Sequence, residues 1–454
     1  MSTDPCTRDE QLARANRPAA EAMRLHAHYR GKIQTAAKVP VRSFDDFAIW
    51  YTPGVAAPCR AIAEDPALVY DYTNRANTVA IVTDGTRVLG LGDIGPRGGM
   101  PVMEGKALLF KYLGGVDAVP LCLETKSAED IIRTVRLIQP TFGGINLEDI
   151  SQPKCFEVLD TLRADPGIEI PVFHDDQQGT ATVLLAGLLN ALKLTNRDIR
   201  NTRFVMVGMG AANVATLRLL LASGVGMEQV VACDSRGILN PAREDVIAQQ
   251  ASFPDKHRLC MESNPEGRCG GPAEALEDAD VLIAFASPGP GVIKPEWVAG
   301  MAKDSIVFAC SNPVPEIWPW EAAEAGARIV GTGRSDFPNQ LNNSLGFPGI
   351  FRGALDVRAR TITDEMCLAA AEALALAGEE IGLDDEHIVP DMQEDGLYAR
   401  EAAAVGLKAI EQGLARVTFT GEELYALADE RIRNARAMIH ALMDEGIIPE
   451  APGE

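Results

Sequence analysis

The sequence lacks the patterns that mark several protein classes. Its nine cysteines include no Cys-x-x-Cys pair, and an odd count without a framework favours reduced thiols in the cytoplasm. No apolar run reaches the roughly 18–20 residues that span a bilayer, and the longest, 183–192 and 368–377, are expected to be buried helices. The polar N-terminus, Met1–Arg17, has no apolar core, so we expect no signal peptide there.

Basic residues are too few to balance the acidic ones. The 454 residues include 42 Lys and Arg against 64 Asp and Glu, which gives a net charge of −22. Such a chain repels nucleic acid and anionic membranes, so neither is expected as a partner. An anionic substrate must then be bound by a local positive site, built from a metal ion, Lys or Arg.

No internal repeat and no low-complexity linker divides the chain. Because single cores stop growing near roughly 250–300 residues, we expect two domains. In the first third, the apolar spacing predicts helices and strands. The expected helices are 19–30, 105–113 and 128–138, and the expected strands are 78–83, 87–91 and 118–123, with a turn at Asp84-Gly85 between the first two strands.

The middle of the chain alternates strands with helices after a long apolar helix over 179–194. The expected strands are 203–207, 229–234, 281–286, 305–309 and 328–331. This alternation predicts an α/β fold with a parallel sheet covered on both faces. We expect domains over 1–176 and 177–350. The mostly helical segment 351–454, with an amphipathic helix over 422–443, would pack back on the core or on a second subunit.

Two glycine patterns are candidates for binding a dinucleotide. The first, Gly-x-Gly-x-x-Gly over 90–95, is followed by two prolines and two glycines within 96–101. A dinucleotide site needs a helix directly after the pattern. Because those residues are expected to forbid a regular helix, we interpret this stretch as a structural loop beside the active site.

The second pattern, Gly208-Met-Gly210-Ala211-Ala212-Asn213, follows an apolar strand and opens an apolar helix. An acidic residue, Asp234, ends the next strand at the distance expected for a ribose contact. Asn213 departs from the pattern, because Gly or Ala is usual there, and an ordinary α/β turn is the alternative. Asp234 favours NAD, whereas Arg236 could pair with a 2′-phosphate, so NAD and NADP both stay open.

Several further motifs occur in a fixed order along residues 31–416. They are Tyr51-Thr-Pro-Gly-Val55, Gly90–Pro96 followed by Pro101-Val-Met-Glu-Gly-Lys106, Asn146-Leu-Glu-Asp-Ile150, Phe173-His-Asp-Asp-Gln-Gln-Gly-Thr180, Ser311-Asn-Pro313 and Asn342-Asn343. Together they resemble the signatures of malic enzymes, in length closest to the bacterial short form. The resemblance implies an N-terminal catalytic domain, a Rossmann-type doubly wound NAD(P)-binding domain and a helical C-terminal tail.

Three carboxylates, Glu148, Asp149 and Asp176, are candidate metal ligands. Their hard oxygens suit Mg²⁺ or Mn²⁺ better than zinc. In a loop the adjacent Glu148 and Asp149 can both turn inward, whereas in a strand they would face opposite sides. From the residues alone a solvated turn is the alternative, and the family resemblance favours the metal site. Asp175 is expected to support Lys106.

The resemblance makes Lys106 the candidate general base and Tyr51 the candidate general acid. A free Lys has a pKa near ~10.4, which burial and a nearby divalent cation could lower, so that Lys106 accepts the C2 hydroxyl proton. A Tyr51 held near this lysine could protonate C3 of the resulting enolate. Without the resemblance, a surface Lys and a packed Tyr would be the simpler interpretations.

Other polar residues could bind substrate or cofactor. Arg87 could hold a malate carboxylate with two hydrogen bonds, and Arg97 is a less favoured alternative. Asn312 and Asn343 match the family's amides that face substrate and nicotinamide, although either could simply form a turn. His174 is expected to be structural.

The resemblance implies oxidative decarboxylation of (S)-malate to pyruvate and CO₂ with reduction of NAD or NADP, dependent on Mg²⁺ or Mn²⁺. A malolactic enzyme, which releases lactate, is the alternative within this chemistry. A catalytically silent metabolite-binding subunit is the alternative from another class. We expect malate as the small-molecule substrate and a homodimer or larger assembly.

Overall fold

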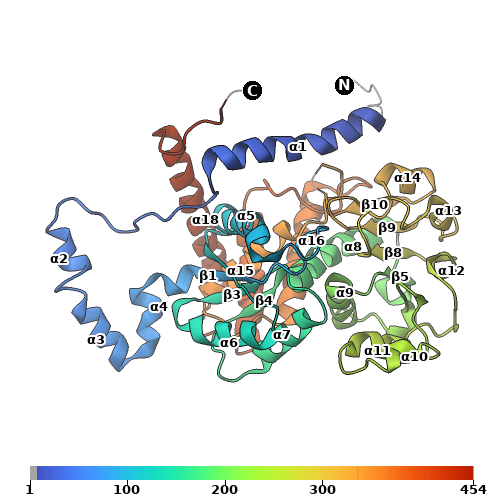
Figure 1. Cartoon of the computed structure of the whole chain (residues 1–454), viewed down its shortest axis with the longest axis horizontal. Helices are drawn as coiled ribbons and strands as arrows, with labels where there is room; N and C mark the ends of the chain where they lie inside the picture. The colour runs from blue at the N-terminus through green and yellow to red at the C-terminus, as the bar shows by residue number, and fades with distance from the viewer. Residues whose placement is uncertain (1–7, 335, 453–454) are drawn as a thin grey trace.

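The computed structural model describes residues 8–334 and 336–452, in which two sheets lie side by side (Figure 1). The first sheet has the order β2-β1-β3-β4 and is entirely parallel. Its strands are β1 (Thr78–Thr83), β2 (Asp117–Cys122), β3 (Gly144–Leu147) and β4 (Val172–His174). Helices α5 (Gly95–Gly114) and α7 (Lys154–Ala164) pack on it, and α6 (Ala128–Ile138) packs on α7.

The structure corrects the expected strand over 87–91. Strand β1 already pairs with β2 on one side and β3 on the other, so a hairpin partner has no free edge. The carboxylate of Asp84 also accepts hydrogen bonds from the backbone and hydroxyl of Thr86, which fixes a tight turn instead. Only one bridge, between Val88 and Gly92, remains in this stretch.

The expectation that 96–101 forbids a regular helix is also wrong. Helix α5 begins at Gly95 and runs through both prolines. Pro96 stands in the first turn, where its missing N–H would have no partner within the helix. Pro101 lies inside the helix, and its carbonyl accepts a hydrogen bond from Lys32 Nζ at 2.7 Å.

The second sheet has the order β10-β9-β8-β5-β6-β7, parallel except for the short edge strand β7. Its strands are β5 (Phe204–Val207), β6 (Val230–Asp234), β7 (Gly237–Ile238), β8 (Val281–Ala284), β9 (Ile306–Ala309) and β10 (Ile329–Thr332). This is the order of a doubly wound dinucleotide-binding sheet, with β7 in the place of its third strand. It confirms the expected α/β fold with a Rossmann-type sheet.

Short helices connect these strands, and a long buried helix precedes them. They are α8 (Thr180–Leu194), α9 (Ala211–Ala222), α10 (Glu244–Ile247), α11 (Pro254–Glu262), α12 (Pro272–Leu276), α13 (Pro295–Val298) and α14 (Pro319–Glu324). Helix α8 packs against α9 and thereby joins the two halves of the molecule.

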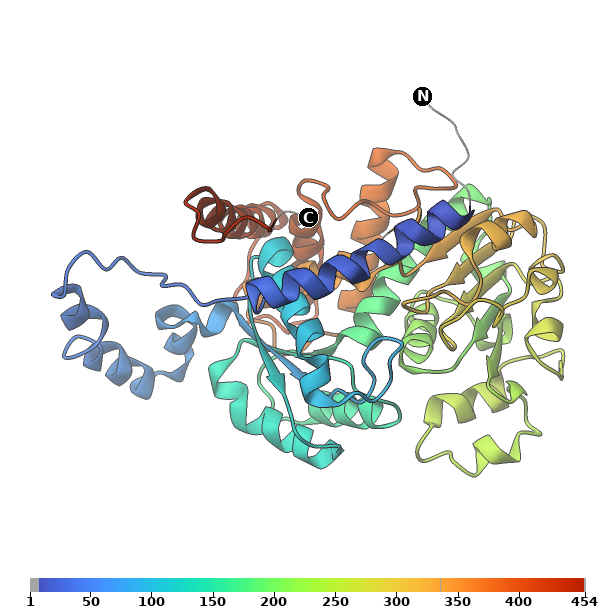
Figure 2. The same cartoon turned by 45° about the horizontal axis from the view of Figure 1, so that its top comes forward.

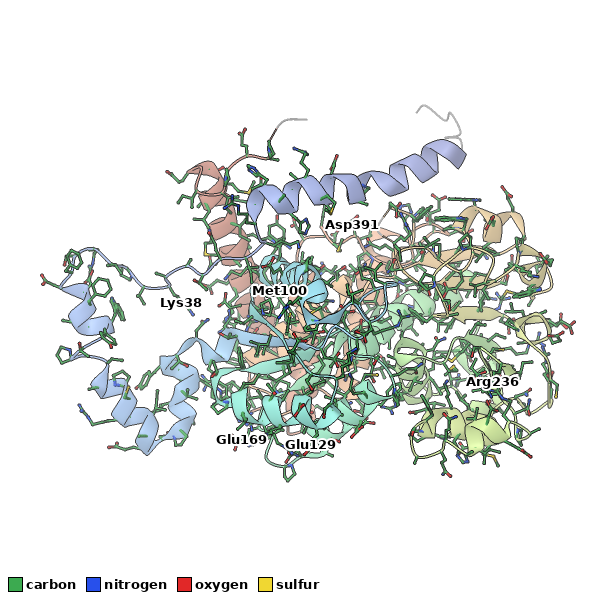
Figure 3. The ribbon with its side chains drawn as sticks, viewed as in Figure 1. Lys38, Met100, Glu129, Glu169, Arg236 and Asp391 are labelled. Atoms are coloured by element: carbon green, nitrogen blue, oxygen red, sulfur yellow. The ribbon has the colours of Figure 1, made fainter. Side chains whose placement is uncertain are left out.

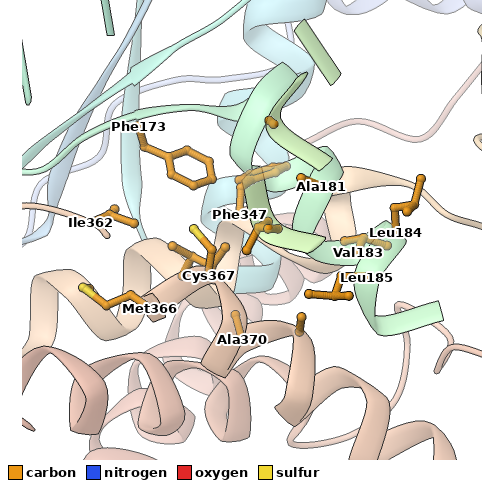
Figure 4. Close-up of a cluster of buried hydrophobic side chains, with 14 of the residues drawn as sticks. Phe173, Ala181, Val183, Leu184, Leu185, Phe347, Ile362, Met366, Cys367 and Ala370 are labelled. Carbon is orange, nitrogen blue, oxygen red and sulfur yellow. The ribbon is translucent and has the colours of Figure 1, made fainter. Parts of the chain in front are cut away.

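The last part of the chain is helical, as expected, and returns to the core. It comprises α15 (Phe347–Asp356), α16 (Asp364–Ile381), α17 (Leu397–Glu411) and α18 (Gly421–Asp444). Side chains of β4, α8 and α16 share one buried cluster, in which Phe173, Val183 and Met366 are labelled in Figure 4. Helix α18 packs on α5 and α17. The expected boundaries after residues 176 and 350 remain predictions.

The N-terminal segment extends away from this body. Helix α1 (Arg8–Tyr29) runs along the outside of the molecule (Figure 2), and Tyr29 donates a hydrogen bond to the carbonyl of Pro449 near the C-terminus. An arm then projects to the left in Figure 1, with helices α2 (Asp46–Trp50), α3 (Ala56–Glu64) and α4 (Val69–Tyr72). None of the helices in the described residues is both long and apolar enough to cross a membrane.

Candidate active site

The carboxyl ends of two parallel strands carry the acidic side chains of the site. Glu148 and Asp149 follow β3, while Asp175 and Asp176 follow β4. Strands β3 and β4 are hydrogen-bonded neighbours, so both pairs lie at the same edge of the sheet. Asp175 begins a single π-helical turn before α8, a local irregularity that is frequent at functional sites.

Lys106 reaches this edge from the middle of α5. Its ammonium lies 2.5 Å from Asp175 Oδ2 and 3.1 Å from Glu148 Oε1. The ring of Phe347, at the start of α15, lies beneath it with its centroid 4.4 Å from Nζ. Lys106 is only 7% exposed. The structure therefore brings Lys106, Asp175 and Glu148 together, although Glu148 lies 42 residues and Asp175 lies 69 residues after Lys106 in the sequence.

Glu148, Asp149 and Asp176 converge on one point. One carboxylate oxygen from each lies within 4.8 Å of the others. Strand β3 ends at Leu147, and Asp149 takes a left-handed conformation with φ 54°, so Glu148 and Asp149 need not face opposite sides. The backbone N–H of Asp149 donates to Asp176 Oδ2 at 2.8 Å and fixes the two loops against each other.

These carboxylates fit a divalent cation. Asp149 Oδ2 is buried and has no hydrogen-bond partner in the described residues. Burial and the neighbouring charges of Asp176 and Glu148 raise the pKa of Asp149 to about 9. Burial also raises the pKa values of Glu148 and Asp176, because the single charge of Lys106 does not offset the cost of ionising all three carboxyl groups. A hard cation would satisfy the free oxygen and the charge together.

The pKa of Lys106 differs from the sequence expectation. Burial disfavours the ammonium form, but the charges of Asp175 and Glu148 outweigh burial and raise the pKa above its ordinary value. In the structure Lys106 is therefore protonated. The sequence predicts a lowered pKa from burial together with a nearby divalent cation. Burial alone does not produce it, because two carboxylates approach the amine closely.

Arg87 lies beside the cluster, in the loop between β1 and α5. Its backbone N–H donates to the carbonyl of Asp149 at 3.0 Å, and its exposed guanidinium contacts the carbonyl of Leu89. Burial raises the pKa of Asp176, and the positive charge of Arg87 opposes this rise. The Arg87 charge therefore acts on the acidic cluster. Arg97 is exposed and lies 3.9 Å from Glu124, away from these contacts.

His174 is fully buried at the end of β4, with Nδ1 3.7 Å from Asp176 Oδ2. Burial lowers the pKa of His174 to about 4. A neutral, enclosed imidazole agrees with the structural role expected for it.

The second glycine pattern forms an open cradle at the end of β5. Gly208 has φ 86°, and a Cβ there would lie 2.4 Å from the carbonyl oxygen of Phe285. Gly210 faces open space, and α9 begins directly after it with Ala211 and Ala212. The N-terminal amides of a helix placed in this way suit a pyrophosphate.

The hydrogen bonds of Asn213 account for its presence where Gly or Ala is usual. Its buried amide donates to the carbonyls of Val207 and Gly208, at 3.0 and 2.8 Å, and so ties helix to strand where a small residue usually allows them to pack. Asp234 stands at the end of β6, beside the cradle, and its carboxylate accepts the backbone N–H of Arg236. These features fit the ribose end of a dinucleotide.

The candidate nicotinamide end lies where the two halves meet. A Cβ on Gly90 would be 2.4 Å from the carbonyl oxygen of Asn312, so the first-domain loop touches the loop after β9. Asn312 Nδ2 lies 3.5 Å from the carbonyl of Gly333. Asn343 is half-buried and precedes α15, which also carries Phe347 beneath Lys106.

Tyr51 is separated from Lys106 within the chain. It ends α2 in the projecting arm, is 68% exposed, and makes no side-chain hydrogen bond within the described residues. Figures 1 and 2 both show the arm away from the sheet that carries the acidic cluster. The expected proximity of Tyr51 and Lys106 is absent in a single chain, and the role of Tyr51 remains a prediction.

Two polar groups that organise the site escaped the sequence analysis. Buried Glu316 accepts hydrogen bonds from Ala286 N, Ser311 N and Ser311 Oγ, and thereby joins the loops after β8 and β9. Buried Asp84 forms an ion pair with Lys154, which follows the metal-site loop. The one available signal was position: Glu316 lies three residues beyond Pro313 of a quoted motif, and Asp84 lies in the turn expected after the strand over 78–83.

Two family models match the chain. The malic enzyme N-terminal domain matches residues 30–163, and the malic enzyme NAD-binding domain matches residues 177–410. An NAD-dependent malic enzyme of Geobacillus stearothermophilus is 50% identical, over 86% of this chain and 79% of the relative. A bifunctional malic/malolactic enzyme of Bacillus subtilis is 47% identical, over 89% of this chain and 96% of the relative.

A solved structure agrees with these matches. The crystal structure of Entamoeba histolytica malic enzyme is 48% identical, covers 99% of this chain and 93% of its own, and has a TM-score of 0.95. The resemblance seen in the motifs therefore extends through the fold of nearly the whole chain. The chain belongs to the malic enzyme family, as an NAD(P)-dependent enzyme similar to the short bacterial members.

Proposed function

We propose that this protein oxidises and decarboxylates (S)-malate to pyruvate and CO₂, reducing NAD⁺ or NADP⁺ with the help of Mg²⁺ or Mn²⁺. One observation carries the proposal: a buried lysine contacts Asp175 and the candidate metal ligand Glu148, in a domain whose Gly90 loop touches Asn312 beside the dinucleotide cradle. The cytoplasmic location expected from the sequence remains a prediction.

Glu148, Asp149 and Asp176 would hold the divalent cation. The chemistry that such an ion supplies is charge, which polarises the oxygen at C2 and stabilises the negative charge left when CO₂ departs. Its positive charge would also oppose the two carboxylates that hold the proton on Lys106. Arg87 would bind a carboxylate of malate.

Lys106 would accept the proton of the C2 hydroxyl while the C2 hydride passes to the nicotinamide. It must first lose its own proton, and Asp175 Oδ2, at 2.5 Å, is placed to take it. The bond between C3 and the adjacent carboxylate then breaks to release CO₂, and its electron pair remains as an enolate. A proton delivered to C3 completes pyruvate.

We propose that Tyr51 delivers this last proton to the site of a second subunit. The arm exposes a group of large apolar side chains, namely Phe44, Phe47, Ile49, Trp50 and Tyr51, with exposed fractions from 45% to 90%. An exposed patch of this kind marks an interaction surface. A symmetric dimer would cover both arms and place each Tyr51 in its partner's site, since a two-fold contact is reciprocal.

Cofactor reduction tests the reaction. Wild-type protein with malate and Mn²⁺ should accumulate reduced nicotinamide and pyruvate in equal amounts. Formation of lactate without net cofactor reduction would instead establish the malolactic reaction, which the name of the Bacillus subtilis relative makes a specific alternative. Malate binding without any product would support a silent subunit.

Mixed subunits test the shared site. Lys106→Ala and Tyr51→Phe should each abolish or strongly reduce turnover alone. After unfolding together and refolding at equal amounts, half of the dimers would be mixed, and each mixed dimer would have one intact site. Roughly a quarter of the wild-type activity should then return. If Tyr51 acts within its own chain, no site is intact and no activity returns.

A further inference from the structure

We propose that this protein prefers NAD to NADP, and that Asp245 maintains the preference by engaging Arg236 and Arg243, the two cations able to pair with a 2′-phosphate. The inference rests on the proposed dinucleotide-dependent function and specifies its cofactor.

A tight hairpin places Arg236 next to the ribose-binding acid. Asp234 ends β6 and pairs with Gly237 of β7, so that only Ser235 and Arg236 form the turn. Figure 3 labels Arg236 in the half of the molecule built around the second sheet. Its guanidinium is 70% exposed and lies 3.2 Å from Asp245 Oδ2. An arginine at this position would be a natural partner for a 2′-phosphate if it were available.

Arg243 is held more firmly than Arg236. Its Nε donates to Asp245 Oδ1 at 2.8 Å, and its Nη2 donates to Asp245 Oδ2 and Asp234 Oδ2, each at 2.9 Å. Its side chain is only 13% exposed. Hydrogen bonding to Arg243 lowers the pKa of Asp245 to about 2, so Asp245 stays charged at neutral pH.

The cluster is therefore electrically balanced, with two carboxylates and two guanidinium groups. The ribose 2′-hydroxyl of NAD adds no charge and can donate a hydrogen bond to Asp234. A 2′-phosphate would add close to two negative charges beside Asp234. It would also compete with Asp245 for both arginines. Asp245 pairs with Arg236 and with Arg243, and Arg243 pairs in addition with Asp234.

Replacing Asp245 by asparagine removes one negative charge and keeps the shape of the side chain. Arg236 then loses its charged partner, and its exposed guanidinium can turn toward a 2′-phosphate, for which its forked geometry is well suited. Arg243 keeps Asp234 as a partner. The substitution should therefore strengthen NADP binding and leave NAD binding nearly unchanged.

Calorimetric titration of NAD and NADP into metal-free protein without malate measures this directly. Wild-type protein should bind NAD more tightly. Asp245→Asn should strengthen NADP binding about tenfold, the effect expected of one charge-assisted hydrogen bond, and change NAD binding by less than about twofold. Adding Arg236→Ala to Asp245→Asn should reverse the gain.

Asp280→Asn is the matched control. Asp280 also faces two arginines, with contacts of 3.2 Å to Arg197 and 3.8 Å to Arg203. It precedes β8 at the amino ends of the parallel strands, however, whereas Asp234 stands at the carboxyl end of β6. The control substitution should leave the ratio of the two affinities unchanged. Should Asp245→Asn fail to fold, Asp245→Ser in its place should likewise strengthen NADP binding relative to NAD binding.

Two results would overturn the inference: equal or tighter binding of NADP by wild-type protein, or an Asp245→Asn variant with an unaltered affinity ratio. Failure of wild-type protein to bind either dinucleotide would instead count against the proposed function, so the two failures are distinguishable.

Discussion

Asp149 combines three structural constraints in one residue. Its left-handed backbone, with φ 54°, lets it leave β3 without turning its side chain away from Glu148. Its N–H contacts Asp176, and its carbonyl accepts from Arg87 N. Its carboxylate keeps one buried oxygen without a partner. The residue thus connects the loop that carries Arg87 to the acidic cluster.

The pKa of Asp149 predicts how pH and metal act on stability. Its folded pKa of about 9 lies above its ordinary value of 3.8. Such a group favours the folded state below the ordinary pKa, and this contribution is lost as pH rises through the folded pKa. Metal-free protein should therefore unfold at progressively lower temperature between about pH 6 and pH 9, as followed by scanning calorimetry.

Mn²⁺ should reverse this loss, because it requires the deprotonated carboxylates. The stabilisation by saturating Mn²⁺ should be larger at pH 8 than at pH 6, and binding should release about one proton per ion. Titrations in buffers of different ionisation enthalpy measure the proton release. Mn²⁺ binding without proton release, and with equal stabilisation at both pH values, would show that the cluster is not the binding site.

At the scale of elements, the loop between β1 and α5 connects the acidic cluster to the other half of the molecule. Buried Asp84 holds its first turn and pairs with Lys154. Thr86 Oγ1 accepts from Ser151 N at 3.0 Å, next to the metal-site loop. At its tip Gly90 touches Asn312 in the other half of the molecule. The Asp84–Lys154 pair therefore positions groups that it does not itself contact.

Breaking this ion pair should weaken the site. Lys154→Met leaves Asp84 buried and unpaired, which should lower the free energy of unfolding by about 3 kcal/mol. Mn²⁺ binding should weaken and KM for malate should rise, since both loops lose their anchor. Chemical denaturation, calorimetry and steady-state kinetics measure these three effects.

Two further variants separate charge from position. Asp84→Asn combined with Lys154→Met removes both charges and should recover part of the stability but not the KM. Lys193→Met breaks the half-exposed pair with Glu379 and should change stability by less than about 1 kcal/mol. A Lys154→Met protein with unchanged KM and Mn²⁺ affinity would show that the loop needs no such anchor.

The sequence predicted the elements whose signal is local. Alternation and apolar runs located β1, β2 and five of the six strands of the second sheet, because buried parallel strands are short apolar segments. The expected strand over 87–91 failed for a non-local reason, namely that β2 and β3 already occupy both sides of β1. The prediction that residues 96–101 forbid a helix failed because proline is compatible with the first turn of a helix.

The candidate site was predictable as a set of residues but not as an arrangement. Motifs named Lys106, Glu148, Asp149, Asp175 and Asp176, and the structure brings these five together. The direction of the Lys106 pKa depends on separations of 2.5 and 3.1 Å, which no pattern encodes. The paired arginines of Asp245 were missed because Arg243 lies seven residues beyond Arg236, in another element.

At the scale of the whole molecule, the arm is the part that the single chain leaves without a partner. In α2 and α3 Asp46 is the one buried residue, and the apolar side chains of that region point outward. The body carries Lys106 and the acidic cluster, whereas the arm carries Tyr51. If the arm serves a neighbouring subunit, assembly and catalysis should be inseparable.

Phe44 offers the sharpest test, since it is 90% exposed and lies in the arm, apart from the acidic cluster. Phe44→Asp would place a charge in the proposed interface, where an unpaired charge strongly opposes association. Light scattering should then show a larger share of monomer, and specific activity should fall on dilution, with recovery at high protein concentration.

Leu137→Asp is the matched control, because Leu137 is 70% exposed on α6 of the body and should change neither property. A monomeric Phe44→Asp protein with full activity would mean that each chain completes its own site, and would remove the reason for placing Tyr51 in the partner.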